Sequence, residues 1–447
     1  MRTPDDLLRQ AEKPTAESLR LSPLYKGKIQ VLPKCPVRGI EDFAIWYTPG
    51  VAAPCKLIQA SPDAVYDHTN KGNSIAIVSD GTRVLGLGDI GPAAGLPVME
   101  GKALLFKYLG GVDAVPLCLD TKSPEDIIRV VRALAPTFGG INLEDISQPK
   151  CFRILDELRG SLDIPVWHDD QQGTATVVLA GVLSALCVVG KDLRRVRIAM
   201  VGMGAANVAV YRLLKASGAD VASIVACDSK GVLNRNRQDI ASRSGEYVDK
   251  WRICTETNAE GWSGGIAEAL RGADVCIAFA RSGPGVIDPA NIRGMAADAV
   301  VFACANPVPE IWPWEATAAG ARIVATGRSD FPNQVNNSLI FPGIFRGVLD
   351  VRARSITDSM AMAAAHELVR CAEARGIRAD AILPTMEDWT VAASIAAATG
   401  MQAQADGVAY LSASRDDLYA QAIEKIQNAR RATSLLMEHE LIQPPPP

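Results

Sequence analysis

The chain has 447 residues, of which 48% are hydrophobic and 21% are charged, and its formal net charge is −4. The length favours two domains, and the composition is typical of a soluble globular protein that buries a sizeable core. The weak negative charge and the lack of a basic stripe argue against a nucleic-acid-binding protein and against attraction to an anionic membrane surface.

Ten cysteines are scattered along the sequence, and no two have the C-x-x-C spacing of a zinc knuckle or a dithiol redox motif. A disulfide scaffold is not expected in so long and apolar a chain. The amphipathic residues 1–13 lack the apolar centre of a signal peptide. We therefore expect a cytoplasmic protein.

The first part of the chain, residues 1–165, mixes helical patterns with short strands such as residues 74–78. Its Gly- and Pro-rich segments predict loops, which often carry functional residues. Tyr47 precedes one Pro-Gly turn, and Lys102 follows Gly101 at an expected helix start, where the helix dipole and burial would both favour a neutral amine. Both are candidate proton carriers, although such residues more often only pack or stay solvated.

Two acidic pairs each end an apolar stretch: Glu144 and Asp145 follow GGINL, and Asp169 and Asp170 follow LDIPVW with one intervening histidine. Strands that end in carboxylates place them together at one edge of a sheet. Oxygen ligands gathered there suit Mg²⁺ or Mn²⁺. The alternative is that the acidic residues are helix N-caps.

Residues 174–190 carry no charged side chain and are just short of a membrane span. They are rich in small residues and a strand pattern follows them, so we expect a buried crossover helix.

From about residue 165 onward, short apolar strands alternate with helices. The expected strands are residues 197–202, 222–228, 275–280, 299–303 and 322–325. Such alternation predicts a doubly wound parallel sheet. The fold class is therefore α/β: a mixed α/β domain over residues 1–165, then a doubly wound, Rossmann-like domain over residues 166–447 with a helical C-terminal region. These last helices would cover a face of the molecule or lie at a subunit contact.

A dinucleotide-binding pattern follows the strand at residues 197–202. Its members are Gly202, Gly204, Ala205, Ala206 and Asn207. The glycines allow a tight turn and a close approach of backbone N–H groups to a pyrophosphate at the helix start. Asn207 replaces the usual third glycine, so a purely structural turn remains the alternative. Asp228, 26 residues after Gly202, favours a free ribose 2′-hydroxyl, whereas Lys230 would attract a 2′-phosphate.

Several segments stand in a fixed order from about residue 20 to about residue 410: YTPGVAAPC, SDGTRVLGLGDIGPAAGLPVMEGKALLFK, PTFGGINLEDI, HDDQQGTA, VGMGAANVA, CDSKG, FACANPVPEI and ATGRSDFPNQVNNSLIFPGIFRGVLDVRA. Together they resemble the short bacterial type of the malic enzyme family. We expect none of the additional phosphotransacetylase-like domain that some relatives carry.

The resemblance implies oxidative decarboxylation of malate to pyruvate and CO₂, with NAD⁺ or NADP⁺ and with Mg²⁺ or Mn²⁺. It makes residues 1–165 the catalytic and substrate domain and residues 166–447 the dinucleotide-binding domain. It makes Glu144, Asp145 and Asp170 the metal ligands. Asp169 would instead face the ammonium of Lys102, so each member of the second acidic pair has its own compensating charge. It also implies a homo-oligomer, a dimer or a tetramer.

The resemblance further assigns roles in the reaction. Lys102 would accept the proton of the C2 hydroxyl, and Tyr47 would protonate the enolate carbon. Asn306 and Asn337 fall where the family contacts substrate and nicotinamide, with Asn306 on the cofactor side as well. Arg83 is placed to clamp a substrate carboxylate, although many short relatives lack an arginine there.

Gln172 departs from the family motif, in which a histidine stands at this position. If the family histidine is structural, its replacement by glutamine has little effect. If the histidine tunes the adjacent carboxylates, the replacement shifts the metal affinity or the pH optimum. A third possibility is that Gln172 admits a different substrate, a substituted malate or another β-carboxylated 2-hydroxy acid. A catalytically silent dinucleotide-binding interaction protein is the alternative of a different class.

Overall fold

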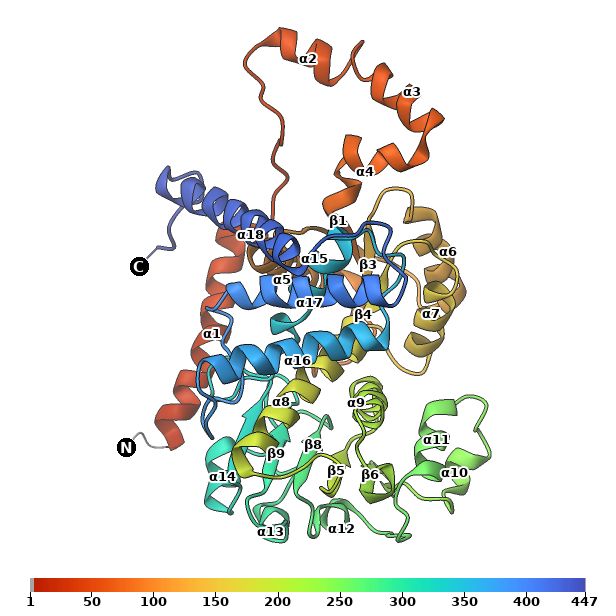
Figure 1. Ribbon diagram of the computed structural model, residues 1–447. Helices are drawn as coiled ribbons and strands as arrows, with labels where there is room; N and C mark the ends of the chain where they lie inside the picture. The colour runs from red at the N-terminus through yellow and green to blue at the C-terminus, as the bar shows by residue number, and fades with distance from the viewer. Residues whose placement is uncertain (1–3, 447) are drawn as a thin grey trace.

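The computed structural model describes residues 4–446 and contains two sheets, one parallel and one mainly parallel, flanked by helices (Figure 1). The first sheet has the strand order β2-β1-β3-β4. Its strands are β1 (Ser74–Ser79), β2 (Asp113–Cys118), β3 (Gly140–Leu143) and β4 (Val166–His168). All of its pairings are parallel. The central strand β1 is buried along its whole length, as expected for a strand covered on both faces.

Three helices connect the strands of the first sheet: α5 (Pro92–Gly110), α6 (Pro124–Leu134) and α7 (Lys150–Arg159). Helix α6 begins where the sequence provides a cap, because the Ser123 side chain accepts the N–H of Asp126 and Pro124 occupies the first turn.

The second sheet has the order β10-β9-β8-β5-β6-β7, and only β7 is antiparallel to its neighbour. Its strands are β5 (Ile198–Val201), β6 (Ile224–Asp228), β7 (Gly231–Val232), β8 (Val275–Ala278), β9 (Val300–Ala303) and β10 (Ile323–Thr326). Its helices are α9 (Ala205–Ala216), α10 (Gln238–Ala241), α11 (Val248–Glu256), α12 (Ile266–Leu270), α13 (Pro289–Arg293) and α14 (Pro313–Ala318). The predicted doubly wound α/β fold is confirmed.

A π-helical turn, η3 (Asp169–Gly173), and helix α8 (Thr174–Val189) lead from the first sheet toward the second. Within residues 4–446, the continuous helical stretch Asp169–Val189 is the only one long and apolar enough to cross a membrane, and most of it is buried inside the protein. Its apolar composition is therefore used for packing, as expected for a crossover helix.

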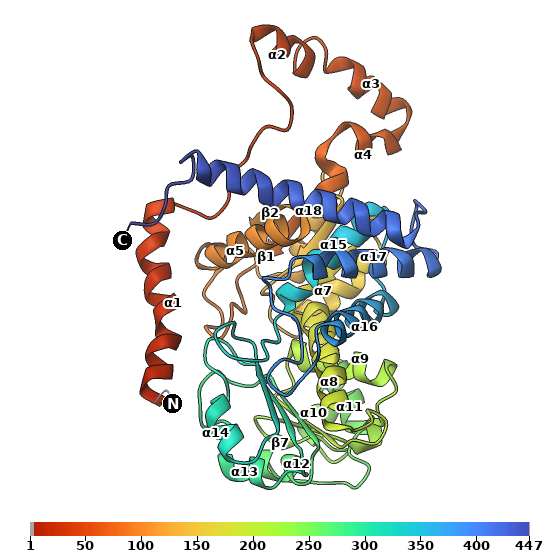
Figure 2. The same cartoon turned by 60° about the vertical axis from the view of Figure 1, so that its left-hand side comes forward.

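The C-terminal helices are α15 (Phe341–Asp350), α16 (Asp358–Ala374), α17 (Thr390–Ala405) and α18 (Arg415–Glu438). Helices α15 and α18 contact α5 of the first sheet, and α16 contacts α8 (Figure 2). The C-terminal helices therefore pack against helices from both sides of residue 165. The division into two domains at this residue stays a prediction.

The N-terminal segment contains α1 (Pro4–Tyr25), which lies along one side of the body, followed by a projecting arm. We define the arm as residues 31–68. It contains α2 (Ile40–Trp46), α3 (Ala52–Ala60), the short turn η1 (Pro62–Ala64) and α4 (Val65–His68), and it extends away from the body in both views (Figures 1 and 2). The turn η2 (Asn70–Asn73) leads back to β1. The remaining short turns are η4 (Val221–Ser223) and η5 (Asn337–Leu339).

Candidate active site

The two acidic pairs lie side by side, because β3 and β4 are adjacent parallel strands and each pair follows the carboxyl end of its strand. Ligand oxygens of Glu144, Asp145 and Asp170 all lie within 4.8 Å of one another. The backbone N–H of Asp145 donates to Asp170 Oδ2 at 2.8 Å. Asn142, two residues before Glu144 and therefore on the same side of β3, donates to Glu144 Oε2 at 2.9 Å.

This cluster carries more negative charge than its surroundings compensate. Burial, followed by the charge of Asp170, raises the pKa of Asp145 to about 8. Burial also holds the pKa of Glu144 well above its ordinary value. Among the residues that the structure describes, Asp145 Oδ2 is buried without a hydrogen-bond partner. Three carboxylates whose negative charge is not fully compensated offer the oxygen ligands that a divalent cation such as Mg²⁺ or Mn²⁺ prefers.

Lys102 lies beside this cluster. Its ammonium is paired with Asp169 and lies 2.8 Å from Glu144 Oε1, and it sits 4.3 Å from the centre of the Phe341 ring. Burial alone would lower the pKa of Lys102, but the charges of Asp169 and Glu144 outweigh burial and hold this pKa above its ordinary value. The expected helix start is wrong, because Lys102 lies in the middle of α5. Burial acts as expected, but the neighbouring carboxylates oppose the neutral amine.

Asp169 and Asp170 point to different partners because of the π-helical turn that contains them. Asp169 is fully buried and accepts a hydrogen bond from Trp167 Nε1 at 3.0 Å. A Cβ atom on Gly173 would lie 1.9 Å from Asp169 Oδ1, so only glycine leaves room for this carboxylate. Asp169 therefore faces Lys102 while Asp170 faces Asp145. Such π-turns are frequent at functional sites.

Gln172 lies outside the ligand cluster. Its side-chain oxygen accepts the backbone N–H of His168 at 3.0 Å. The His168 ring is fully buried, and burial lowers its pKa to about 4. Gln172 borders a small pocket beside α9 and α16 and is not among the residues that line the large cavity described next. Its position supports a structural role and gives no support to a role in choosing a different substrate.

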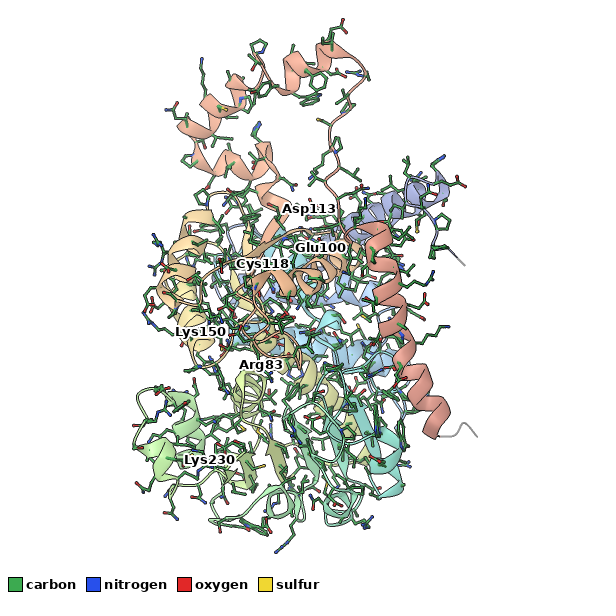
Figure 3. The ribbon with its side chains drawn as sticks, turned by 180° about the vertical axis from the view of Figure 1, so that it is seen from behind. Arg83, Glu100, Asp113, Cys118, Lys150 and Lys230 are labelled. Carbon is green, nitrogen blue, oxygen red and sulfur yellow. The ribbon has the colours of Figure 1, made fainter. Side chains whose placement is uncertain are left out.

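A cavity of about 790 Å³ opens between the two sheets, next to the acidic cluster. Many of the predicted site residues line it: Arg83, Lys102, Glu144, Asp145, Asp170, Gly204, Ala205, Ala206, Asn306 and Asn337. Figure 3 shows Arg83 between the upper and lower halves of the molecule, with Lys230 farther down on the second-sheet side. The cavity thus joins the acidic cluster to the glycine-rich turn.

The glycine-rich turn has the geometry that the sequence predicts. Gly202 has φ +85°, and a Cβ there would lie 2.5 Å from the carbonyl oxygen of Phe279. Helix α9 begins at Ala205, so its N-terminus faces the cavity. Asn207 is buried, and its Nδ2 donates to the carbonyl oxygen of Gly202 at 2.7 Å. Asn207 therefore braces the turn instead of lining the cavity.

Asp228 is the last residue of β6 and Lys230 follows it, and neither lines that cavity. Both carboxylate oxygens of Asp228 accept from Arg237, at 3.0 and 3.1 Å, and Lys250 Nζ lies 3.4 Å away. Lys230 is exposed and pairs with Asp239 at 3.2 Å. Sequence reasoning missed Arg237 and Lys250, which are ordinary basic residues in a polar stretch. A second cavity of about 790 Å³ is lined by Lys250 and shares Ser147 and Gln148 with the first.

Tyr47 is the predicted residue that the structure does not bring to the site. It lies at the end of α2 on the arm, with 71% of its surface exposed, and it does not line the cavity. The described residues that line the cavity include no tyrosine and no histidine.

Comparison with known proteins gives consistent matches over most of the chain. Residues 171–405 match the family described as "Malic enzyme, NAD binding domain", and residues 26–126 and 122–159 match "Malic enzyme, N-terminal domain". The chain is 46% identical to an NAD-dependent malic enzyme of Geobacillus stearothermophilus, over 86% of this chain and 78% of that protein. It is 44% identical to a bifunctional malic/malolactic enzyme of Bacillus subtilis, over 90% of this chain and 96% of that protein.

Among solved structures, the malic enzyme of Entamoeba histolytica superposes with a TM-score of 0.95 and 49% identity, covering 98% of this chain and 91% of that one. The similarity therefore extends over the arm, both sheets and the C-terminal helices.

Proposed function

The chain belongs to the malic enzyme family, and we propose that it oxidises malate with NAD⁺ or NADP⁺ and decarboxylates the product to pyruvate and CO₂. The observation that carries this proposal is the single cavity that contains the Lys102 ammonium, the three clustered carboxylates and the glycine-rich turn at the start of α9. The ten free cysteines fit the reducing cytoplasm that we propose as its location.

We propose Glu144, Asp145 and Asp170 as the ligands of Mg²⁺ or Mn²⁺. Their raised pKa values and the unpartnered Asp145 oxygen support a bound cation, because positive charge would compensate the buried carboxylates. When bound, the cation would polarise the oxygen at C2 of the substrate and stabilise the enolate that forms as CO₂ leaves.

Lys102 is the proposed proton acceptor for the C2 hydroxyl, as hydride leaves C2 for the nicotinamide. Lys102 must first lose its own proton, and the carboxylates around it oppose that loss. Once the charge of Glu144 is shared with a cation, less negative charge holds the Lys102 proton, and its pKa falls toward the range of a base. Asp169 is buried and does not line the cavity, and its ion pair with Lys102 keeps the ammonium in place.

The remaining lining residues divide between substrate and cofactor. We propose that Arg83 and Asn337 bind oxygen atoms of the substrate. Asn306 is proposed to contact both the substrate and the nicotinamide. The N-terminus of α9, at Ala205 and Ala206, is a suitable partner for the pyrophosphate. The adenosine half then extends past Gln148 into the second cavity, where Lys250 approaches Asp228. Asp228 is already paired with Arg237, and the assay below therefore uses both NAD⁺ and NADP⁺.

The enolate also needs a proton donor, and we propose that Tyr47 reaches it from a second copy of the chain. In the arm, α2 buries only Asp42 and α3 buries no residue, so these short helices have no core of their own. Isolated helices of this length are unstable in water. The arm exposes an unusual number of large apolar side chains: Val31, Leu32, Val37, Ile40, Phe43, Ile45, Trp46, Tyr47, Val51 and Leu57. Surfaces of this kind mark a protein interface.

A matching apolar patch lies next to the cavity. Leu85 and Leu87, in the loop that precedes α5, and Leu96, on α5, are exposed, and Leu85 lines the cavity itself. Gly95 packs this part of α5 against Val84 of the same loop. An arm docked on this patch of another copy would bring Tyr47 to the site that lacks a tyrosine. The proposed assembly is therefore a homo-oligomer, with a dimer as its smallest form.

The function is tested by incubating the purified protein with Mn²⁺, L-malate and either dinucleotide, and following the reduced dinucleotide together with CO₂. Turnover with a substituted malate but not with malate would keep the mechanism and change the substrate. Dinucleotide binding without turnover on any such acid would favour a catalytically silent interaction protein.

A further inference from the structure

Glu310 is a fully buried carboxylate that lies behind the cavity without lining it. It follows β9 in the FACANPVPEI segment. Its Oε1 accepts the backbone N–H of Ala280 at 2.7 Å, and its Oε2 accepts the backbone N–H of Ala305 at 3.0 Å. One side chain therefore joins the loops that follow two neighbouring strands, β8 and β9.

Both of these loops form part of the cavity wall, to which Ala280 and Ala305 themselves belong. Ala280 also packs on the glycine-rich turn, because a Cβ on Gly202 would lie 2.8 Å from its Cα atom. On the other loop, the Asn306 carbonyl packs so closely on Gly86 that a Cβ there would lie 2.1 Å from its oxygen. A shift of either loop would therefore disturb the turn, the loop before α5, or both.

The arrangement requires a carboxyl group. Two backbone donors converge on it, and both oxygens of a carboxyl group can accept a hydrogen bond, whereas glutamine of the same shape would turn an N–H₂ group toward one of the N–H groups. Burying a carboxylate is costly, and here burial raises the pKa of Glu310 to about 7. A group that costs stability at this place points to a role beyond packing.

We infer that Glu310 is a positioning residue for the dinucleotide: it ties the loop after β8, which packs on Gly202, to the loop after β9, which packs on Gly86, and so preforms the part of the cavity that receives the nicotinamide half. This inference rests on the proposed dinucleotide role of the cavity. Ser282 supports the same arrangement, since its hydroxyl donates to the carbonyl oxygen of Val308 at 3.1 Å and accepts the N–H of Val308 at 3.1 Å.

The test compares Glu310→Gln with Glu315→Gln. Glu315 is a matched control because its carboxylate also accepts a backbone N–H, that of Trp312 at the start of α14, but it does not line the cavity or contact its loops. Binding of NADH and NADPH is measured by fluorescence titration without malate, and melting temperatures are recorded in parallel. We expect the dissociation constant to rise about tenfold in Glu310→Gln, the effect of one unsatisfied N–H group, and to change less than about twofold in the control.

Kinetics separate positioning from mere loss of folded protein. A smaller folded fraction lowers kcat and leaves the KM for the dinucleotide unchanged, whereas displaced loops raise that KM. An unchanged dissociation constant in a folded Glu310→Gln protein would overturn the inference and leave the proposed function intact. A wild-type protein that binds neither dinucleotide would overturn both. If Glu310→Gln does not fold, Ser282→Ala replaces it, with a rise of about threefold expected for this weaker link and an unchanged constant again overturning the inference.

Discussion

Lys102 and Asp169 form a buried ion pair between the middle of α5 and the π-helical turn after β4. The pair is not isolated, because Glu144 of the acidic cluster also pairs with the same ammonium, at 2.8 Å. Lys102 thus links the carboxylate that fixes its position to a carboxylate proposed to bind the metal ion. The charge on Lys102 therefore depends on whether a cation occupies the cluster.

Replacement of Lys102 should abolish turnover. We expect Lys102→Ala to lower kcat about a thousandfold, the usual contribution of a positioned acid–base group, while the protein still binds reduced dinucleotide. Lys107→Ala is the matched control, since Lys107 lies on the same helix, is half exposed and pairs with Asp113 at 2.7 Å. Steady-state kinetics with malate measure the effect, and a kcat within tenfold of the wild type would refute the role of Lys102.

Metal removal should abolish activity and lower stability. A chelator removes the cation that compensates Glu144, Asp145 and Asp170, so the melting temperature should fall and recover on addition of Mn²⁺. In Asp170→Asn the stabilisation by Mn²⁺ should disappear, whereas Asp113→Asn, at a carboxylate on β2 outside the cluster, should retain it. Differential scanning calorimetry with and without Mn²⁺ checks this. An equal response of the wild type and Asp170→Asn to Mn²⁺ would contradict the assignment.

Subunit mixing should show that Tyr47 acts across copies. Tyr47→Phe and Lys102→Ala are each expected to be inactive alone. If the arm of one copy completes the site of another, mixed dimers contain one intact site, and random exchange restores up to about one quarter of wild-type activity. The mixture is unfolded and refolded together, and then assayed with malate. Activity no greater than the sum of the separate proteins would exclude this arrangement.

Stability should depend on pH through Glu310. The unfolded chain loses the Glu310 proton near pH 4.5, whereas the folded protein keeps it until about pH 7. Between these values the folded state binds more protons, so the free energy of unfolding falls as pH rises, and the contribution is constant above this window. The thiols of Cys276 and Cys304 lie near Glu310. They stay neutral across this pH window, since burial holds their pKa values well above the ordinary value.

The measurement is the difference in melting temperature between wild type and Glu310→Gln at pH 5 and at pH 8, without dinucleotide. The wild type should lose more stability than the variant between the two pH values, and taking the difference removes the contribution of the other titrating groups. Equal losses in both proteins would contradict the raised pKa of Glu310.

Much of the fold could be predicted from the sequence because its strands are short apolar runs between turn residues. The expected strands at residues 275–280, 299–303 and 322–325 match β8, β9 and β10 to within two residues. The meeting of the two acidic pairs followed from the same pattern, since parallel strands end at one edge of their sheet. These features depend on local composition and need no knowledge of distant contacts.

Other properties of the site depend on contacts between distant parts of the chain. The charge on Lys102 is set by Asp169 and Glu144, which no local pattern connects to α5. Glu310 escaped notice for a related reason, because its partners are backbone N–H groups that have no residue-type signature. The exposure of Tyr47 could not be predicted either, since the turn after it is compatible with both an arm and a packed loop.

The most direct test of the account is the product balance of the wild-type protein with Mn²⁺, L-malate and NAD⁺ or NADP⁺. Pyruvate, CO₂ and reduced dinucleotide should appear in equal molar amounts with at least one of the two dinucleotides. Lactate and CO₂ without net reduced dinucleotide, oxaloacetate without CO₂, or no reaction with either dinucleotide would contradict the proposed oxidative decarboxylation of malate.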